Sequence, residues 1–129
     1  MADLLNIDSD VLGAFQAFKR ELEHDGFSVK VTSGYRSIEE QKRLAREHAL
    51  GTQKLPVATP GCSTHNYGFA IDAVIDPLPP DLRARAHKWN LVWAGNTDPV
   101  HFDPFGFTLW RAILTNLRRD PQLRGVLVC

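Results

Sequence analysis

One charged residue interrupts the apolar run Phe69 to Ile75, FAIDAVI, and this residue limits what the chain can fold into. The run is short and rich in β-branched residues, which predicts a buried strand with Asp72 in its middle. A carboxylate in such a strand needs a partner, because an unpaired buried charge is costly. His65 precedes Asp72 by seven residues, a span of roughly 23 Å in an extended chain. The sequence Asn66-Tyr67-Gly68 between them predicts a bend that brings the two side chains together.

The remaining elements follow from apolar spacing, caps and turn residues. Apolar residues from Val11 to Leu22 predict an amphipathic helix that Gly26 ends. Ser37 and Glu40 form a capping box in front of another helix. The other expected elements are a strand at 27–32, a helix at 38–50, a loop at 51–63, a helix at 82–89, an extended segment at 100–103 and a helix at 107–117. Because strands and helices do not alternate regularly, we predict an α+β fold. One domain is expected over residues 1–129, with a small antiparallel sheet flanked by helices.

The segment Asp98 to Phe102, DPVHF, supplies a second candidate histidine. A four-residue turn from Asp98 to His101 brings its end residues within about 7 Å of each other. Two histidines, one carboxylate and a water form the ligand set of a catalytic zinc site, which we expect on the sheet. Asp98 is then a candidate general base, and Arg36 is a candidate donor to the developing oxyanion.

Each of these residues also has a plainer interpretation. His65 is then a loop histidine without a metal, Asp72 pairs with an arginine or caps a turn, and His101 packs beside Phe102 in the core. Asp98 then only orients a metal ligand from outside the coordination sphere. In the same way, Arg36 pairs with Glu39 or Glu40, Ser63 is a turn residue and Gln41 is an exposed helix position.

Three blocks in register, SGYRSIEEQKRL, PGCSTHNYGFAID and DPVHF, resemble the zinc D-alanyl-D-alanine carboxypeptidase and L-alanyl-D-glutamate endopeptidase family. Its members include bacterial cell-wall enzymes and bacteriophage endolysins, and the resemblance covers residues 31–102. The resemblance implies one zinc ion per chain. Carried over by position, it implies His65, Asp72 and His101 as zinc ligands, Asp98 as the general base, Arg36 as the group that polarises the scissile carbonyl, and Ser63 and Gln41 as substrate-binding residues.

The function implied by this resemblance is a zinc metallopeptidase that hydrolyses peptidoglycan stem peptides. Aspartate rather than glutamate at Asp98 favours the endolysin-like L-alanyl-D-glutamate endopeptidase. Two alternatives stay open: a D-alanyl-D-alanine carboxypeptidase, and a non-catalytic zinc-binding module of the same fold, like Hedgehog signalling domains.

Charge and hydropathy exclude several partners. The chain has 15 basic and 15 acidic residues, so we expect no nucleic-acid partner. No apolar run reaches the roughly 20 residues of a membrane span, and no secretory signal is evident at the start. We therefore expect a monomer that stays in the cytoplasm until it is released to act on the cell wall, or that is carried there by another export route. Free thiols are expected at Cys62 and Cys129.

Overall fold

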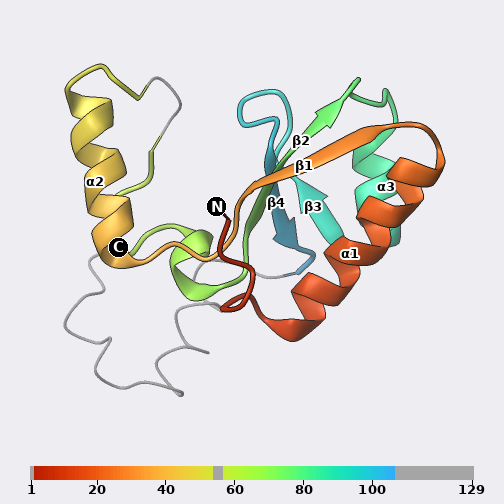
Figure 1. Cartoon of the computed structure of the whole chain (residues 1–129), viewed down its shortest axis with the longest axis horizontal. Helices are drawn as coiled ribbons and strands as arrows, with labels where there is room; N and C mark the ends of the chain where they lie inside the picture. The colour runs from red at the N-terminus through yellow and green to blue at the C-terminus, as the bar shows by residue number, and fades with distance from the viewer. Residues whose placement is uncertain (1, 54–56, 107–129) are drawn as a thin grey trace.

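The computed structural model describes residues 2–53 and 57–106, which form helices around a small sheet (Figure 1). The helix predicted at 107–117 lies outside the described residues. The elements in chain order are α1 (Ser9–His24), β1 (Ser28–Ser33), α2 (Ile38–Ala49), the 3-10 helix η1 (Thr64–Tyr67), β2 (Ile71–Asp76), α3 (Leu82–Lys88), β3 (Leu91–Trp93) and β4 (His101–Pro104).

The four strands form one antiparallel sheet in the order β1-β2-β4-β3. This confirms the predicted α+β fold with a small antiparallel sheet. The edge strand β3 was not predicted. Its three residues, Leu91–Trp93, are too few to show the alternation by which a strand is recognised in a sequence.

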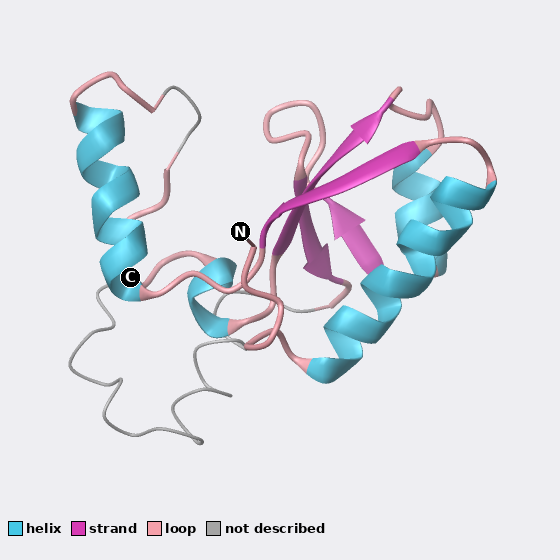
Figure 2. Ribbon diagram, in the orientation of Figure 1, coloured by secondary structure: helices cyan, strands magenta, loops and turns pink. Residues whose placement is uncertain are grey.

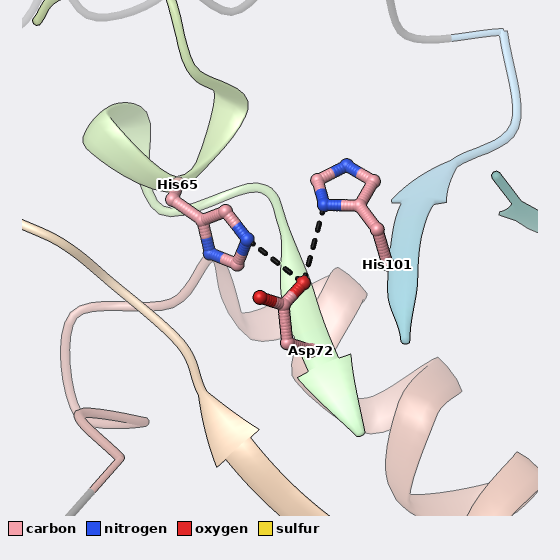
Figure 3. A group of neighbouring side chains, drawn as sticks. All are labelled: His65, Asp72 and His101. Carbon is pink, nitrogen blue, oxygen red and sulfur yellow. Dashed lines mark hydrogen bonds and ion pairs between the residues drawn. The ribbon is translucent and has the colours of Figure 1, made fainter. Parts of the chain in front are cut away.

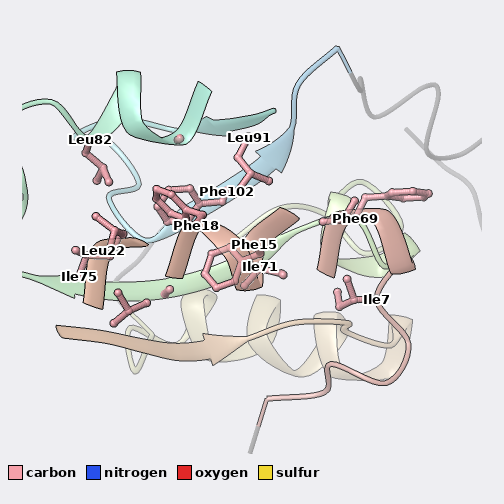
Figure 4. Close-up of a cluster of buried hydrophobic side chains, with 14 of the residues drawn as sticks. Ile7, Phe15, Phe18, Leu22, Phe69, Ile71, Ile75, Leu82, Leu91 and Phe102 are labelled. Carbon is pink, nitrogen blue, oxygen red and sulfur yellow. The ribbon is translucent and has the colours of Figure 1, made fainter. Parts of the chain in front are cut away.

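The core lies between the sheet and the helices α1 and α3 (Figures 2 and 4). Successive side chains of a strand point to opposite faces, so Ile71, Ala73 and Ile75 of β2 enter the core together. The apolar stripe of α1 packs onto them through Val11, Phe15, Phe18 and Leu22. Burying one such large apolar side chain stabilises the fold by about 1.5–3 kcal/mol.

Helix α2 is attached differently from the other two helices. It stands apart from the sheet, on the opposite side of the molecule from α1 and α3 (Figure 1). Its one buried residue is the polar Gln41. One half of the predicted capping box is confirmed, because the Ser37 side chain accepts a hydrogen bond from the backbone N–H of Glu40. The Glu40 carboxylate pairs with Arg43. No helix among the described residues combines the length and apolar character of a membrane span.

Cys62 corrects one expectation from the sequence. It is disulfide-bonded, so the prediction of a free thiol there is wrong. The two cysteines form no short spacing pattern, and sequence patterns of that kind are what indicate a pairing before a structure is known. Cys129 lies outside the described residues.

Candidate metal centre

The chain bends between His65 and Asp72 where the sequence predicted a bend. Ser63 caps the 3-10 helix η1, and Gly68 ends it in the left-handed conformation with φ 76°. A Cβ atom at Gly68 would lie 2.3 Å from the carbonyl oxygen of Asn6, so only glycine fits there. The bend places His65 Nε2 3.0 Å from Asp72 Oδ1.

The sheet brings the second histidine to the same carboxylate. Asp72 on β2 lies directly opposite His101 on β4. The Nδ1 atom of His101 lies 3.2 Å from Asp72 Oδ1 (Figure 3). The ligand atoms of His65, Asp72 and His101 all lie within 4.8 Å of one another. The structure therefore gathers the three residues that the sequence nominated as metal ligands.

The outer nitrogen of each histidine ring has a partner of its own. His65 Nδ1 lies 2.7 Å from the carbonyl oxygen of Gly34. His101 Nε2 lies 2.9 Å from Asp103 Oδ2. An N–H donated to such an acceptor leaves the lone pair of the other nitrogen free to bind a metal. The inward-facing atoms, His65 Nε2 and His101 Nδ1, are the ones left free.

Sequence reasoning did not find Asp103. The available signal was its position two residues after His101 in an extended segment, because residues i and i+2 of a strand share a face. The carboxylate also accepts a hydrogen bond from the Thr64 hydroxyl, with an oxygen–oxygen distance of 2.6 Å. Thr64 is distant in the sequence and only the fold brings it there.

These three groups fit a divalent cation. Two ligand atoms each about 2.1 Å from a tetrahedral zinc ion lie about 3.4 Å apart. The separations of 3.0 and 3.2 Å from Asp72 Oδ1 to the two histidine nitrogens are close to that value. Two imidazoles and one carboxylate also form one of the ligand sets found in catalytic zinc sites.

The electrostatics of the group favour positive charge at its centre. Burial lowers the pKa of His101, but hydrogen bonds to Asp103 and Asp72 outweigh burial and raise that pKa to about 10. Burial raises the pKa of Asp72, but the hydrogen bonds from His101 and His65 hold it well below its usual range. Without a metal, the carboxylate therefore stays charged and draws a proton to His101.

Arg36 is fixed beside the group by three contacts. Its Nη1 donates to Gln41 Oε1 at 3.0 Å, and its Nη2 donates to Ser33 Oγ at 3.1 Å. Nη2 also lies 3.4 Å from Asp72 Oδ2, the oxygen that faces neither histidine. Asp72 thus pairs with an arginine as well as facing the two imidazoles. The carboxylate of Glu40 pairs with Arg43 instead of Arg36.

Gln41 and Ser63 have structural contacts that were not evident from the sequence. The Gln41 side chain is fully buried, and its Nε2 donates to the carbonyl oxygen of Ala58 at 2.8 Å. Gln41 is therefore not an exposed helix position. The Ser63 hydroxyl accepts from the backbone N–H of His65 at 3.2 Å. Their roles in substrate binding stay predictions.

Asp98 is held by the turn that the sequence predicted. The backbone N–H of His101 donates to the carbonyl oxygen of Asp98 at 3.1 Å. The Asp98 side chain is partly buried, and burial raises its pKa above the usual value. Within the described part of the chain, its carboxylate forms no hydrogen bond to a histidine of the group.

A groove of about 450 Å³ opens beside these residues. All seven site residues nominated from the sequence line it: Arg36, Gln41, Ser63, His65, Asp72, Asp98 and His101. The other lining residues described are Thr32, Ser33, Glu40, Leu44, Gln53, Val57, Ala58, Cys62, Thr64 and Val100. The groove lies between the sheet and α2, on the face of the sheet opposite the core.

Comparison with known proteins identifies related chains. Residues 5–107 match the family model VanY, D-alanyl-D-alanine carboxypeptidase. A curated relative from Enterococcus gallinarum, the bifunctional D-Ala-D-Ala dipeptidase and D-Ala-D-Ala carboxypeptidase VanXYC, is 44% identical over 48 residues. The matched segment covers 34% of this chain and only 25% of that relative.

Two solved structures share the fold. One is a mutant of the vancomycin resistance D,D-pentapeptidase VanY from a VanB-type resistance cassette, in complex with Zn(II). The match has a TM-score of 0.62 and 21% sequence identity, and it covers 89% of this chain and 79% of that chain. The other is the LdcB LD-carboxypeptidase, whose structure reveals the molecular basis of peptidoglycan recognition. This match has a TM-score of 0.60 and 20% sequence identity, and it covers 89% of this chain and 64% of that chain.

Proposed function

The chain belongs to the VanY D-alanyl-D-alanine carboxypeptidase family, and from that premise we propose that it is a zinc-dependent peptidase of peptidoglycan stem peptides. One observation carries the proposal. His65 Nε2, Asp72 Oδ1 and His101 Nδ1 converge at a groove that Asp98 and Arg36 also line. Three protein ligands beside an open groove are the arrangement of a catalytic rather than a structural zinc site.

Zinc would be held by His65, Asp72 and His101. Bound there, it lowers the pKa of a coordinated water toward 7 and polarises a carbonyl oxygen. Zinc is supported by the ligand types and by the Zn(II) in the VanY structure of the same fold.

Asp98 supplies the base in this proposal. Its carboxylate lines the groove on the turn that leads into His101. Burial raises its pKa, which moves a carboxylate toward the range in which it exchanges protons near neutral pH. In this proposal, Asp98 takes the proton of the attacking water and passes it to the leaving amine.

Arg36 supplies fixed positive charge. Its guanidinium group is oriented by Gln41 and Ser33, so it needs little reorganisation when negative charge develops on the carbonyl oxygen. A planar guanidinium group that is held from two sides provides fixed positive charge better than a flexible lysine side chain would.

The bond cleaved has two candidates. The family model and the Enterococcus gallinarum relative favour a D-alanyl-D-alanine terminus. A different observation favours an internal L-alanyl-D-glutamate bond. Arg36 is the one lysine or arginine among the described residues that line the groove, and three neighbours already engage it. A terminal carboxylate would have to compete with Asp72 for that cation. Aspartate at the base position supports the same candidate.

Product analysis separates the two candidates. A defined stem peptide that contains both bonds is incubated with the zinc-loaded protein and analysed by mass spectrometry. Free D-alanine identifies the carboxypeptidase, and a new D-glutamate amino terminus identifies the endopeptidase. Absence of both products from a protein shown to contain zinc would overturn the proposed activity and leave a binding module of the same fold. The expected site of action at the cell wall stays a prediction.

A further inference from the structure

Asp103 joins the two segments that carry the histidines. Its Oδ2 lies 2.9 Å from His101 Nε2, and its Oδ1 accepts the Thr64 hydroxyl at 2.6 Å. Thr64 is the first residue of η1 and directly precedes His65. One carboxylate thus connects η1 to β4, over 39 positions of sequence.

The local backbone explains why Asp103 can reach His101. Both residues lie on β4, two positions apart, so their side chains project from the same face of the sheet. Asp103 also precedes Pro104, and a residue before proline is held in an extended conformation. The strand itself therefore brings the Asp103 carboxylate to the His101 ring. The Thr64 hydroxyl holds the second carboxylate oxygen.

The two histidines are oriented by different kinds of partner. A backbone carbonyl, that of Gly34, accepts from His65, whereas a side chain accepts from His101. In the absence of Asp103, the ring keeps its contact to Asp72 through Nδ1, but no other described hydrogen bond holds Nε2. The acceptor that directs the ring proton to Nε2 is then lost. Only the His101 arrangement depends on a residue that mutation can remove.

We propose that Asp103, itself held by Thr64, is a positioning residue that presents Nδ1 of His101 to the metal and so raises metal affinity. The proposal rests on the metal centre of the proposed function and adds two residues to it. Asp103 acts through His101 and need not touch the substrate.

The test measures zinc affinity directly, without an activity assay. The zinc dissociation constant is obtained by competition with a chelator of known affinity, and the Co(II)-substituted protein provides a visible spectrum. Asp103→Ala is expected to raise the zinc dissociation constant about 10- to 100-fold, the usual effect of removing such an outer partner. It should also change the Co(II) spectrum, because His101 Nε2 has lost its acceptor. Asp103→Asn keeps a carbonyl acceptor and should bind zinc more tightly than Asp103→Ala.

Thr64 provides an independent variant on the other side of the carboxylate. Thr64→Val should weaken zinc binding by a smaller factor, and Thr64→Ser should retain wild-type affinity. The double variant Thr64→Val/Asp103→Ala should be no weaker than Asp103→Ala alone, because Thr64 acts through Asp103. Additive losses in the double variant would overturn this link. The Thr64 variants keep the proposal testable if Asp103→Ala does not fold.

Asp98→Ala is the matched control, because it removes one carboxylate charge near the metal centre without removing a described hydrogen-bond partner of either ring. Equal losses of zinc affinity in Asp98→Ala and Asp103→Ala would mean that charge alone acts, and would overturn the positioning role. Wild-type affinity in Asp103→Ala would overturn it as well. A wild-type protein that binds no zinc would refute the metal centre itself, a separate failure that the first measurement reveals.

Discussion

Asp72 on β2 and His101 on β4 face each other across the sheet, on the side away from the core. Their neighbours in the same register, Ile71 and Phe102, are both 1% exposed and belong to the core. A slip of one residue would bury the two polar residues and expose the two apolar ones, so the core enforces the register. The packing that stabilises the sheet thereby also sets the distance between two candidate metal ligands.

Replacement of a ligand should remove metal binding. For His101→Ala we expect a loss of zinc affinity greater than the roughly 10- to 100-fold that an outer partner costs. Inductively coupled plasma mass spectrometry after dialysis would show less than stoichiometric zinc in this variant. His24→Ala, on the surface end of α1, is the control and should retain the metal.

Removal of the metal from the wild-type protein should have the corresponding effect on activity. Chelator treatment should abolish hydrolysis, and added zinc should restore it.

Zinc affinity should increase with pH. The pKa of His101 is raised to about 10 in the metal-free protein, so its ring is protonated at neutral pH. Binding at Nδ1 must release that proton, and a lower pH therefore opposes binding. Between pH 6 and 8 the apparent affinity should rise about tenfold per pH unit for one proton released. Calorimetry in two buffers of different ionisation enthalpy measures this release; a pH-independent affinity would contradict the protonated state of His101.

Loss of the Asp98 carboxylate should impair turnover but not metal binding. We expect Asp98→Asn to lower kcat about 10²- to 10⁴-fold, the usual contribution of a general base. Zinc content should stay stoichiometric, because Asp98 is not one of the three converging ligands. Steady-state kinetics on a stem peptide, paired with metal analysis of the same sample, checks both. An unchanged kcat would remove Asp98 from the mechanism.

Gln41 should matter for stability. Gln41→Leu removes two part-buried hydrogen bonds, one to the Ala58 carbonyl oxygen and one from Arg36 Nη1. We expect a loss of about 1–3 kcal/mol in the free energy of unfolding, measured by urea denaturation. Gln16→Leu is a matched control, because Gln16 is exposed on α1 and its replacement should change stability by less than about 0.5 kcal/mol. Similar effects of the two substitutions would argue against the bridging role of Gln41.

Replacement of two different glycines by alanine should change the stability of the protein in opposite directions. Gly68→Ala places a Cβ 2.3 Å from the Asn6 carbonyl oxygen at a residue with φ 76°. The left-handed conformation alone costs alanine roughly 1–2 kcal/mol, so we expect a larger total loss and weaker zinc binding through His65. Gly13→Ala, on α1 with no atom within 4 Å of the added Cβ, should stabilise the protein by about 0.5–1 kcal/mol. Thermal unfolding of both variants measures the contrast.

The sequence by itself determined the features that depend on near neighbours. The apolar stripe of α1, the Ser37 cap and the bend before Gly68 were all predicted, because spacing, capping and turn preferences involve residues a few positions apart. The ligand candidates were also identified from their types and from the resemblance of three short blocks.

The tertiary structure determined which residues that are distant in the sequence contact one another. The pairing of Asp72 with His101, the burial of Gln41 and the contact of Asp103 with Thr64 join residues that are remote in the chain. Strand β3 is recognised only by its partner β4, because three residues carry too little periodicity. The physical reason is that strand register and the burial of a polar side chain depend on the elements packed against them, which local sequence does not specify.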